Sequence, residues 1–361
     1  MNKLYKIICF FAVVLLLIVL TSKINIFNLI SSNDTGLAKK ILIEENIFSK
    51  KLFYEGELDG ITNIFLKDID NEIGLDLAIF GSKEMHIVNL DSGVKKSELK
   101  LQWPTKISRP ELIYKKPGSY IIMSRGPVSD VGLIDKNGIP IWNYKPGINV
   151  HSMSTADLNN DGEPEYYAAT GKGLHQLNSK GILTWKSDRL VYDVEIFNDN
   201  AENLQLVATI NLSGEMQFRD YYGKRIRKIQ FDNQIFNSGF FEFISWTDQN
   251  QILSNSGNSF FIFDHQGKLI LKHSLENDIF DIRGCAVRFD HNEGPFLAIV
   301  AKFSSSTKRS MLCVFNSNGI LVYKELIGKS ICLLPIPLQT SENEGLLVGE
   351  FPNKVYEYSK L

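Results

Sequence analysis

The sequence has little that would tie the chain to a disulfide scaffold, to nucleic acid or to a known catalytic motif. It has four cysteines in 361 residues, too few for a disulfide framework, and six histidines without close pairing. Lys plus Arg number 39 and Asp plus Glu 41, so the basic excess of a nucleic-acid-binding protein is missing. Gly-x-Ser-x-Gly, His-Glu-x-x-His and Gly-rich phosphate loops are absent. With 44% hydrophobic residues, the composition favours a packed globular protein.

The N-terminus has the pattern of a secretory leader. Lys3 and Lys6 precede an apolar run from Ile7 to Leu20, which is short for a membrane span. No Ala-x-Ala-like cleavage site follows, so an uncleaved signal anchor over residues 1–22 is favoured, with a cleaved signal peptide as the alternative. The positive start predicts an extracytoplasmic position for the rest of the chain, membrane-anchored or secreted. Residues 23–45 have the composition of a stalk or linker.

A repeated unit dominates the rest of the chain, residues 46–361. Alternating apolar residues lead to Asp or Asn, then to a Gly turn, then to a second alternating run. The turn glycines are Gly93, Gly138, Gly181, Gly223, Gly267 and Gly319. Alternation with a period of two on both sides of such a turn predicts a β-hairpin. Two further strand-like runs precede each hairpin, so each period of about 43 residues holds four short strands.

Four strands in each repeat are typical of a β-propeller blade. The length predicts an all-β, seven-bladed propeller of four-stranded antiparallel blades, preceded by the N-terminal apolar helix. The last repeat stops after its third strand. Residues 46–54 have strand character, and we expect them to close the ring as the missing outer strand. A pair of β-sandwiches or an open solenoid is the alternative, whereas an apolar period of two excludes a helical repeat.

One loop has the spacing of a calcium site. In Asp157–Glu165, oxygen-bearing side chains stand at positions 1, 3, 5 and 9, with Gly at position 6. The predicted ligands are the side chains of Asp157, Asn159, Asp161 and Glu165 and the backbone carbonyl of Glu163. Three carboxylates with neutral oxygens favour calcium over a transition metal. A tight acidic turn without metal is the alternative.

A weaker second loop occurs in the first repeat. Asp68, Asp70, Glu72 and Asp76 fall at the same four positions, but Ile73 replaces the Gly. Since Glu72 is also one carbon longer than Asp, this loop is a poorer candidate for calcium.

The loop from Asp157 to Thr170, followed by Gly171-Lys172-Gly173, resembles the FG-GAP or VCBS repeats of integrin-α-like β-propellers. The hairpins Phe260 to Leu271 and Leu312 to Lys324 resemble quinoprotein-type propeller repeats. The resemblance implies an extracellular binding or scaffold module whose calcium loops brace the blades. It names no ligand, because one fold hosts many functions.

The conspicuous aromatic and cysteine residues have structural interpretations. Trp142, Trp185 and Tyr323 share one hairpin position, so we expect them to be blade-packing residues, with stacking on a ligand as the alternative. The second group, Cys285, Cys313 and Cys332, lies in predicted strands. Their spacing fits no zinc motif, and we expect buried free thiols, with one disulfide as the alternative.

The sequence as a whole favours a monomeric, non-enzymatic propeller that binds a protein or glycan partner, with no nucleic acid and with membrane contact through the N-terminal segment alone. Two alternatives stay open. One is an extracytoplasmic polysaccharide hydrolase or lyase with a site at the channel mouth, because blades bring distant acids together. The other is an envelope-assembly scaffold.

Overall fold

The computed structural model describes residues 47–361 with internal gaps. The residues outside this description are 1–46, 59, 68–75, 82–83, 101–111, 114–119, 125–130, 136–138, 200–203, 232–240, 247–249, 276–278, 305–308, 331 and 339–342. The predicted leader (1–22) and stalk (23–45) therefore lie outside the described residues. Among the described residues, no helix is long and apolar enough to cross a membrane.

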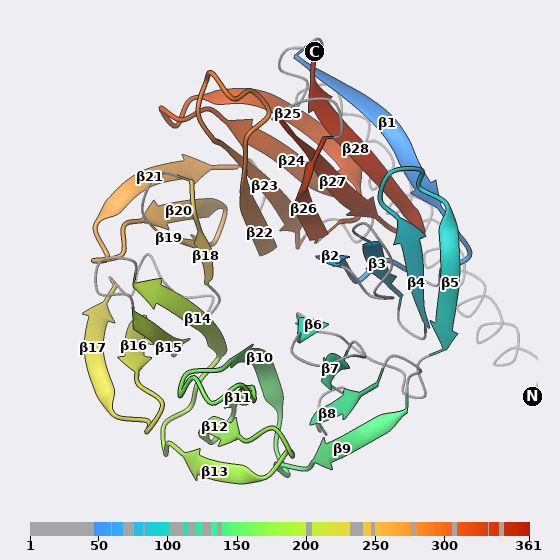
Figure 1. Cartoon of the computed structure of the whole chain (residues 1–361). Coiled ribbons are helices and arrows are strands. Elements are labelled where there is room, and N and C mark those ends of the chain that lie inside the picture. The colour runs from blue at the N-terminus through green and yellow to red at the C-terminus, as the bar shows by residue number, and fades with distance from the viewer. Residues whose placement is uncertain are drawn as a thin grey trace, which may run out of the picture.

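The strands form antiparallel four-stranded sheets arranged in a ring (Figure 1). Three sheets come from the first part of the chain. The first holds β2 (Asn63–Lys67), β3 (Asp76–Phe80), β4 (Glu84–Asn89) and β5 (Lys95–Lys100). The second holds β6 (Leu112–Ile113), β7 (Tyr120–Ser124), β8 (Val131–Ile134) and β9 (Pro140–Tyr144). The third holds β10 (Val150–Ala156), β11 (Glu165–Thr170), β12 (Gly173–Leu177) and β13 (Leu183–Lys186).

Three further sheets follow in chain order. The fourth holds β14 (Asp193–Asp199), β15 (Leu204–Ile210), β16 (Glu215–Arg219) and β17 (Arg225–Gln230). The fifth holds β18 (Glu242–Ile244), β19 (Gln251–Ser256), β20 (Ser259–Phe263) and β21 (Leu269–Ser274). The sixth holds β22 (Ile279–Val287), β23 (Phe296–Phe303), β24 (Arg309–Phe315) and β25 (Leu321–Gly328). In each sheet the first strand lies nearest the centre of the ring and the last lies outside (Figure 1).

The remaining sheet joins the two ends of the described chain. Its order is β1 (Phe48–Glu55), β28 (Lys354–Lys360), β27 (Glu344–Glu350) and β26 (Cys332–Pro337). Residues 48–55 therefore supply its outer strand, close to the predicted 46–54. The Lys50 ammonium lies 3.0 Å from the carboxylates of both Glu325 on β25 and Glu350 on β27, so it ties this strand to two sheets. Pairing β1 with β28 leaves no open gap in the ring.

The hairpin turns form as the Asx-Gly pattern predicts. In the turn between β12 and β13, the Asn178 side chain accepts hydrogen bonds from the amides of Lys180 and Ile182, and the Gly181 amide donates to the Asn178 carbonyl. Gly181 has a φ of 75°, a conformation that other residues rarely adopt. The same bonding recurs at Asp264 and Asn316.

The apolar cores lie between neighbouring sheets rather than within one. One cluster joins Phe260 and Ile262 of β20 to Leu297 and Ile299 of β23 and to Phe315 of β24. Both faces of the middle strands are therefore buried, as in β23, whose pattern has one partly exposed residue in eight. Such runs lose the alternation of a half-exposed sheet, and each blade is stabilised by its neighbours.

Aromatic residues lock consecutive blades together. The Trp142 indole N–H donates to the Ser179 carbonyl in the next blade, at 3.2 Å, and the Trp185 indole N–H donates to Tyr221 at 2.9 Å. Each indole ring lies against a turn glycine of the next blade, Trp142 against Gly181 and Trp185 against Gly223. The predicted packing role of these two residues is confirmed, and Tyr323 joins an inter-blade core.

Two expectations about the fold need correction. The predicted helix lies outside the described residues, and all described elements are strands, so the described fold contains no helix. The predicted seven-bladed propeller of four-stranded blades is also wrong: six blades are detected in the described residues, and in the remaining β6–β9 sheet the first strand has two residues, too few to form a full blade ladder.

Candidate functional site

The acidic loop predicted from the sequence connects β10 to β11, the two strands of their blade that lie nearest the centre of the ring (Figure 1). The strands hold its ends together, because Thr155 on β10 donates its hydroxyl to the Glu165 carbonyl at 2.7 Å. The loop turns sharply at Asn160, whose φ is 57°, and at Gly162, whose φ is 91°. Asn tolerates this left-handed conformation better than most residues, and Gly adopts it freely.

The loop brings three predicted ligands together. One carboxylate oxygen each from Asp157, Asp161 and Glu165 lies within 4.8 Å of the others. Backbone amides orient them: Asp161 and Gly162 donate to the two oxygens of Asp157 at 3.0 Å, and Leu158 donates to Glu165 at 3.0 Å. Glu165 is buried at 5% exposure. Three carboxylates this close repel one another, and a hard cation bound by oxygen would relieve that repulsion.

The other two predicted ligands, Asn159 and Glu163, form hydrogen bonds with Asp161. The side-chain oxygen of Asn159 accepts from the Asp161 amide at 3.0 Å, and its amino group donates to Asp161 at 2.8 Å. The Glu163 amide donates to Asp161 at 2.7 Å, which fixes the turn. The donor set of Asp157, Asp161 and Glu165 fits calcium or another hard divalent cation, while Asn159 acts here through Asp161.

The weaker second loop is described only at its end. Asp68, Asp70 and Glu72 lie outside the described residues. Asp76 is buried at 1% exposure, and its carboxylate pairs with the Lys96 ammonium at 3.0 Å. In the described part, Asp76 is thus the partner of a cation on the outer strand β5.

A polar hollow of about 320 Å³ adjoins the acidic loop. The first strands of three consecutive blades, β10, β14 and β18, contribute to its wall. The lining residues are Ser154, Thr155, Glu195, Ile196, Asn198, Phe243, Ser245 and Asn250. Glu195 is the one carboxylate among them, and it accepts a hydrogen bond from the Phe243 amide at 2.9 Å. The residues that line this hollow therefore do not include the pair of carboxylates that a glycosidase site uses.

The Glu195 contact is one of several hydrogen bonds between neighbouring blades that the sequence analysis did not predict. Carboxylates on the first strand of one blade accept hydrogen bonds from backbone amides of the first strand of the next blade. Asp193 accepts from Phe241 at 3.1 Å, and Glu242 accepts from Gly284 at 3.1 Å. Each pair is separated by about one blade period, so an acid in the first strand of successive repeats is the signal that could have identified them.

His151 and the three described cysteines pack within the fold and form no cluster with one another. His151 stacks on Tyr192 with ring centroids 4.7 Å apart, and burial lowers its pKa. The thiols of Cys285, Cys313 and Cys332 are free, and burial raises the pKa of Cys313 to about 12. Burial also raises the pKa of Cys285, and a raised pKa leaves the Cys285 and Cys313 thiols with little of the reactive thiolate.

Comparison with known proteins supports the fold and leaves the family open. No protein-family model matches the sequence, and no curated protein matches it. Among solved structures, the chain is similar to BBS1N in complex with ARL6DN, with a TM-score of 0.61, 11% identity, and coverage of 88% of this chain and 98% of that one.

Two other solved structures show the same fold. The WD40 domain of Pan2 from Neurospora crassa gives a TM-score of 0.56 at 10% identity, covering 88% of this chain and 96% of that one. BamB from Moraxella catarrhalis gives 0.51 at 13% identity, covering 83% and 86%. These similarities establish a β-propeller, and they do not confirm membership of the FG-GAP or VCBS family.

Proposed function

We propose that this chain is a non-enzymatic β-propeller scaffold that binds a protein partner and whose β10–β11 loop takes calcium. The convergence of Asp157, Asp161 and Glu165 is the observation that carries the calcium part. The closed ring supports the scaffold part, because a rigid ring can present loops from several blades to one partner. The structural neighbours include a propeller crystallised in complex with another protein, which agrees with a protein partner.

Calcium would act here as a brace. Bound by the three carboxylates, it would offset their mutual repulsion and fix the end of β10 against the start of β11. That end of β10 also forms part of the polar hollow, since Ser154 and Thr155 line it. Fixing the loop would therefore fix one wall of the hollow. The apolar N-terminal segment supports a further part of the proposal, that the propeller is anchored to a membrane and lies outside the cytoplasm.

Thermal unfolding of the full-length chain tests the calcium site. With millimolar calcium against chelator, we expect an increase in Tm, because a ligand that binds only the folded state stabilises it, by about 2.7 kcal/mol at a hundred times Kd. Asp161→Asn should abolish the increase. Asp264→Asn is the matched control, because Asp264 accepts turn amides in another blade without an acidic cluster. An unchanged Tm with calcium in the wild-type chain would refute the site.

Crosslinking in native cells tests the scaffold. The full-length chain is expressed, treated with a short amine-reactive crosslinker, and the crosslinked peptides are identified by mass spectrometry. We expect one defined second protein, crosslinked to lysines of neighbouring blades. Crosslinks confined to the chain itself would contradict a scaffold function.

A further inference from the structure

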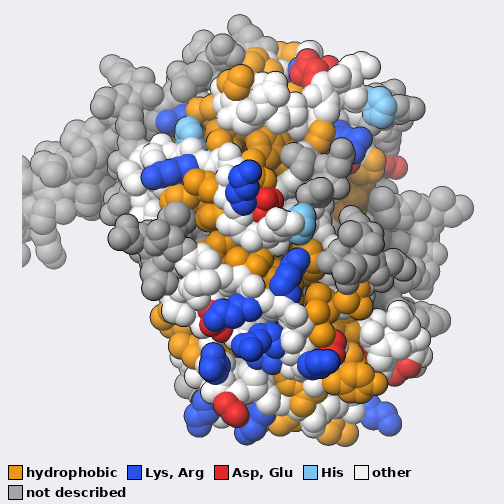
Figure 2. Space-filling model, turned by 90° about the vertical axis from the view of Figure 1, so that its left-hand side faces the viewer, with side chains coloured by type: hydrophobic (Ala, Val, Ile, Leu, Met, Phe, Trp, Pro, Cys, Tyr) orange, Lys and Arg blue, Asp and Glu red, His pale blue; other side chains and the backbone are white. Residues whose placement is uncertain are grey.

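The outer strand β17 carries three cations and no acid, and Lys224 directly precedes it. Residues 224–228 read Lys-Arg-Ile-Arg-Lys, and no acid follows up to Gln230. On the other basic outer strand, β5, Lys95 pairs with Glu98 at 2.9 Å and Lys96 pairs with Asp76. Figure 2 views the molecule from the side of β17 and β21, and it shows Lys and Arg side chains gathered over its lower part with few acids between them.

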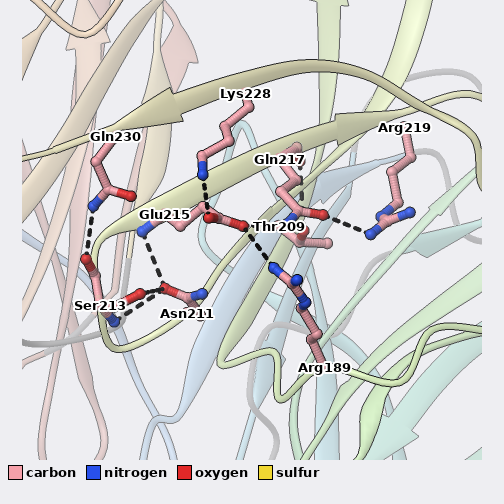
Figure 3. Close-up of polar contacts among 9 residues, drawn as sticks. All are labelled: Arg189, Thr209, Asn211, Ser213, Glu215, Gln217, Arg219, Lys228 and Gln230. Atoms are coloured by element: carbon pink, nitrogen blue, oxygen red, sulfur yellow. Dashed lines mark hydrogen bonds and ion pairs between the residues drawn. The ribbon is translucent and has the colours of Figure 1, made fainter.

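Two more arginines join this group through a buried carboxylate (Figure 3). Glu215 on β16 is 8% exposed. Its carboxylate lies 2.5 Å from the Lys228 ammonium and 3.6 Å from the guanidinium of Arg189, which comes from the loop before β14. It also accepts from Gln217, whose own side-chain oxygen accepts from Arg219 at 2.5 Å. One carboxylate thus gathers three cationic side chains from two neighbouring blades.

The positive charge at this edge exceeds the negative. The cations are Arg189, Arg219, Lys224, Arg225 and Lys228, and the acids in the same stretches of chain are Asp188, Glu215 and Asp220. Burial together with the repulsion of Arg225 and Arg189 lowers the pKa of the Arg219 guanidinium. The Arg189 side chain is 72% exposed and that of Lys228 is 44% exposed. An anionic group could therefore reach them without rearrangement of the fold.

The backbone of β17 is also open to pairing. It is the last strand of the β14–β17 sheet, and no described strand pairs with its outer edge. Arg227 turns its guanidinium onto the Phe218 ring at 4.0 Å and belongs to the core. Ile226 is 48% exposed beside Lys228. Lysines on an edge strand usually discourage pairing, because they repel cationic strands and lose hydration against apolar ones. An acidic strand is complementary to them.

We propose that β17 is the docking edge for an extended acidic peptide segment of a protein partner, which pairs with the strand while its carboxylates contact Arg189, Arg225 and Lys228. Backbone hydrogen bonds along the edge give such a peptide its orientation, and the side-chain contacts give its sequence preference. An apolar residue of the peptide covers Ile226. This inference rests on the proposed scaffold function, and it specifies the surface and the chemistry of the partner.

Fluorescence anisotropy with the full-length chain tests the proposal. The probe is a short fluorescein-labelled peptide in which Glu alternates with Val. We expect binding, weakened about tenfold by Arg189→Gln with Arg225→Gln, as two lost exposed ion pairs would give. Both side chains are exposed, so the fold is retained. The control pair Lys268→Gln with Lys272→Gln removes the same charge beside β21 and should leave the affinity unchanged.

A second probe separates strand pairing from simple charge attraction. The same peptide with methyl groups on alternate backbone nitrogens keeps its charge but cannot pair with an edge, so we expect it to lose binding. Equal binding of the two peptides, equal affinity in the arginine double variant, or binding of heparin or anionic vesicles in place of the peptide would each overturn the proposal. If the double variant still crosslinks its partner in cells, the scaffold function stands and this docking edge is refuted.

Discussion

The neighbouring blades β10–β13 and β14–β17 share one framework and carry opposite charges at different places. The first gathers Asp157, Asp161 and Glu165 in the loop between β10 and β11, the two strands nearest the centre of the ring. The second gathers cations on its outer strand and around Glu215. The acidic group lies beside a hollow lined by three blades, while the basic group lies on an open edge.

The two blades share one contact between consecutive repeats, in which a tryptophan ring of one blade packs on a turn glycine of the next; we call this contact the lock. Trp142 meets Gly181 in the first blade, and Trp185 meets Gly223 in the second. The lock recurs at the blade period because each blade must bury its face against the next. Within the described residues, the three-carboxylate cluster and the Glu215 group do not recur at the blade period. Residues that depart from the repeat in this way are the candidates for function, and residues that follow it hold the ring together.

The largest expected effect on the free energy of unfolding comes from substituting the glycines on which Trp142 and Trp185 pack. A Cβ at Gly181 would lie 2.5 Å from the Trp142 ring, against 3.1 Å between Gly223 and the Trp185 ring, and both glycines have a positive φ. We expect Gly181→Ala to lower the free energy of unfolding by about 3 kcal/mol, and Gly223→Ala by about 1 kcal/mol less. Urea unfolding of the full-length chain measures both.

Gly257→Ala is the control for backbone strain alone. Its φ is 57°, and an added Cβ would meet no atom within 4 Å. We expect this variant to lose about 1 kcal/mol. If all three substitutions cost the same, the contact with tryptophan contributes nothing, and the proposed difference between the two locks is wrong.

The second prediction concerns the buried carboxylate of the basic blade. Hydrogen bonds from Lys228 and Gln217 lower the pKa of Glu215 from its ordinary value of 4.5. A carboxyl group with a lowered folded-state pKa stabilises the fold above its unfolded pKa and loses that contribution as the pH falls through the folded value. Glu215→Gln should cost about 2 kcal/mol at neutral pH and progressively less as the pH falls below about 4.5.

Unfolding at several pH values, for wild type and variant side by side, provides the measurement. The double variant Glu215→Gln with Lys228→Met completes a cycle, since it removes both partners together. We expect the double variant to lose less free energy of unfolding than the two single variants lose together, because neither charge is left unpaired. A difference between wild type and Glu215→Gln that stays constant from neutral to acidic pH would contradict the electrostatic explanation.

The framework was predictable from sequence and the charged edge was not. The alternation and the turn glycines predicted strands, hairpins and closure, because these depend on residues near one another in the chain. The prediction of seven blades failed, because it came from chain length and repeat period, which do not show whether the strands of one repeat are long enough to form a blade; β6 has two residues.

The candidate sites divide in the same way. The Asp157 loop is local, so its spacing indicated which carboxylates converge. Arg189 and Glu215 belong to different repeats, and the carboxylate bonds of Asp193 and Glu242 also cross from one blade to the next. The recurrence of an acid in the first strand of successive repeats is a sequence signal for the Asp193 and Glu242 contacts, but only the ring shows which amide each acid reaches. The pairing of Arg189 with Glu215 has no such recurrence.

The smallest expected effect distinguishes the two locks by their hydrogen bonds. Trp185 shares its acceptor, because the Tyr221 carbonyl also accepts from the Gln176 side chain at 3.2 Å. Trp142→Phe leaves the Ser179 carbonyl without its indole donor, whereas Trp185→Phe leaves Tyr221 with a second donor. We expect losses of about 1 and about 0.5 kcal/mol beyond the shared cost of truncating the ring. Urea unfolding of the two variants, and of Trp185→Phe with Gln176→Leu, measures the difference. Gln176→Leu also removes hydrogen bonds with Tyr167 and Thr184, so the Trp185→Phe loss in the double variant is taken relative to the Gln176→Leu single variant. Without the second donor, that loss should rise to the Trp142→Phe value, and an unchanged loss would show that the shared acceptor is irrelevant.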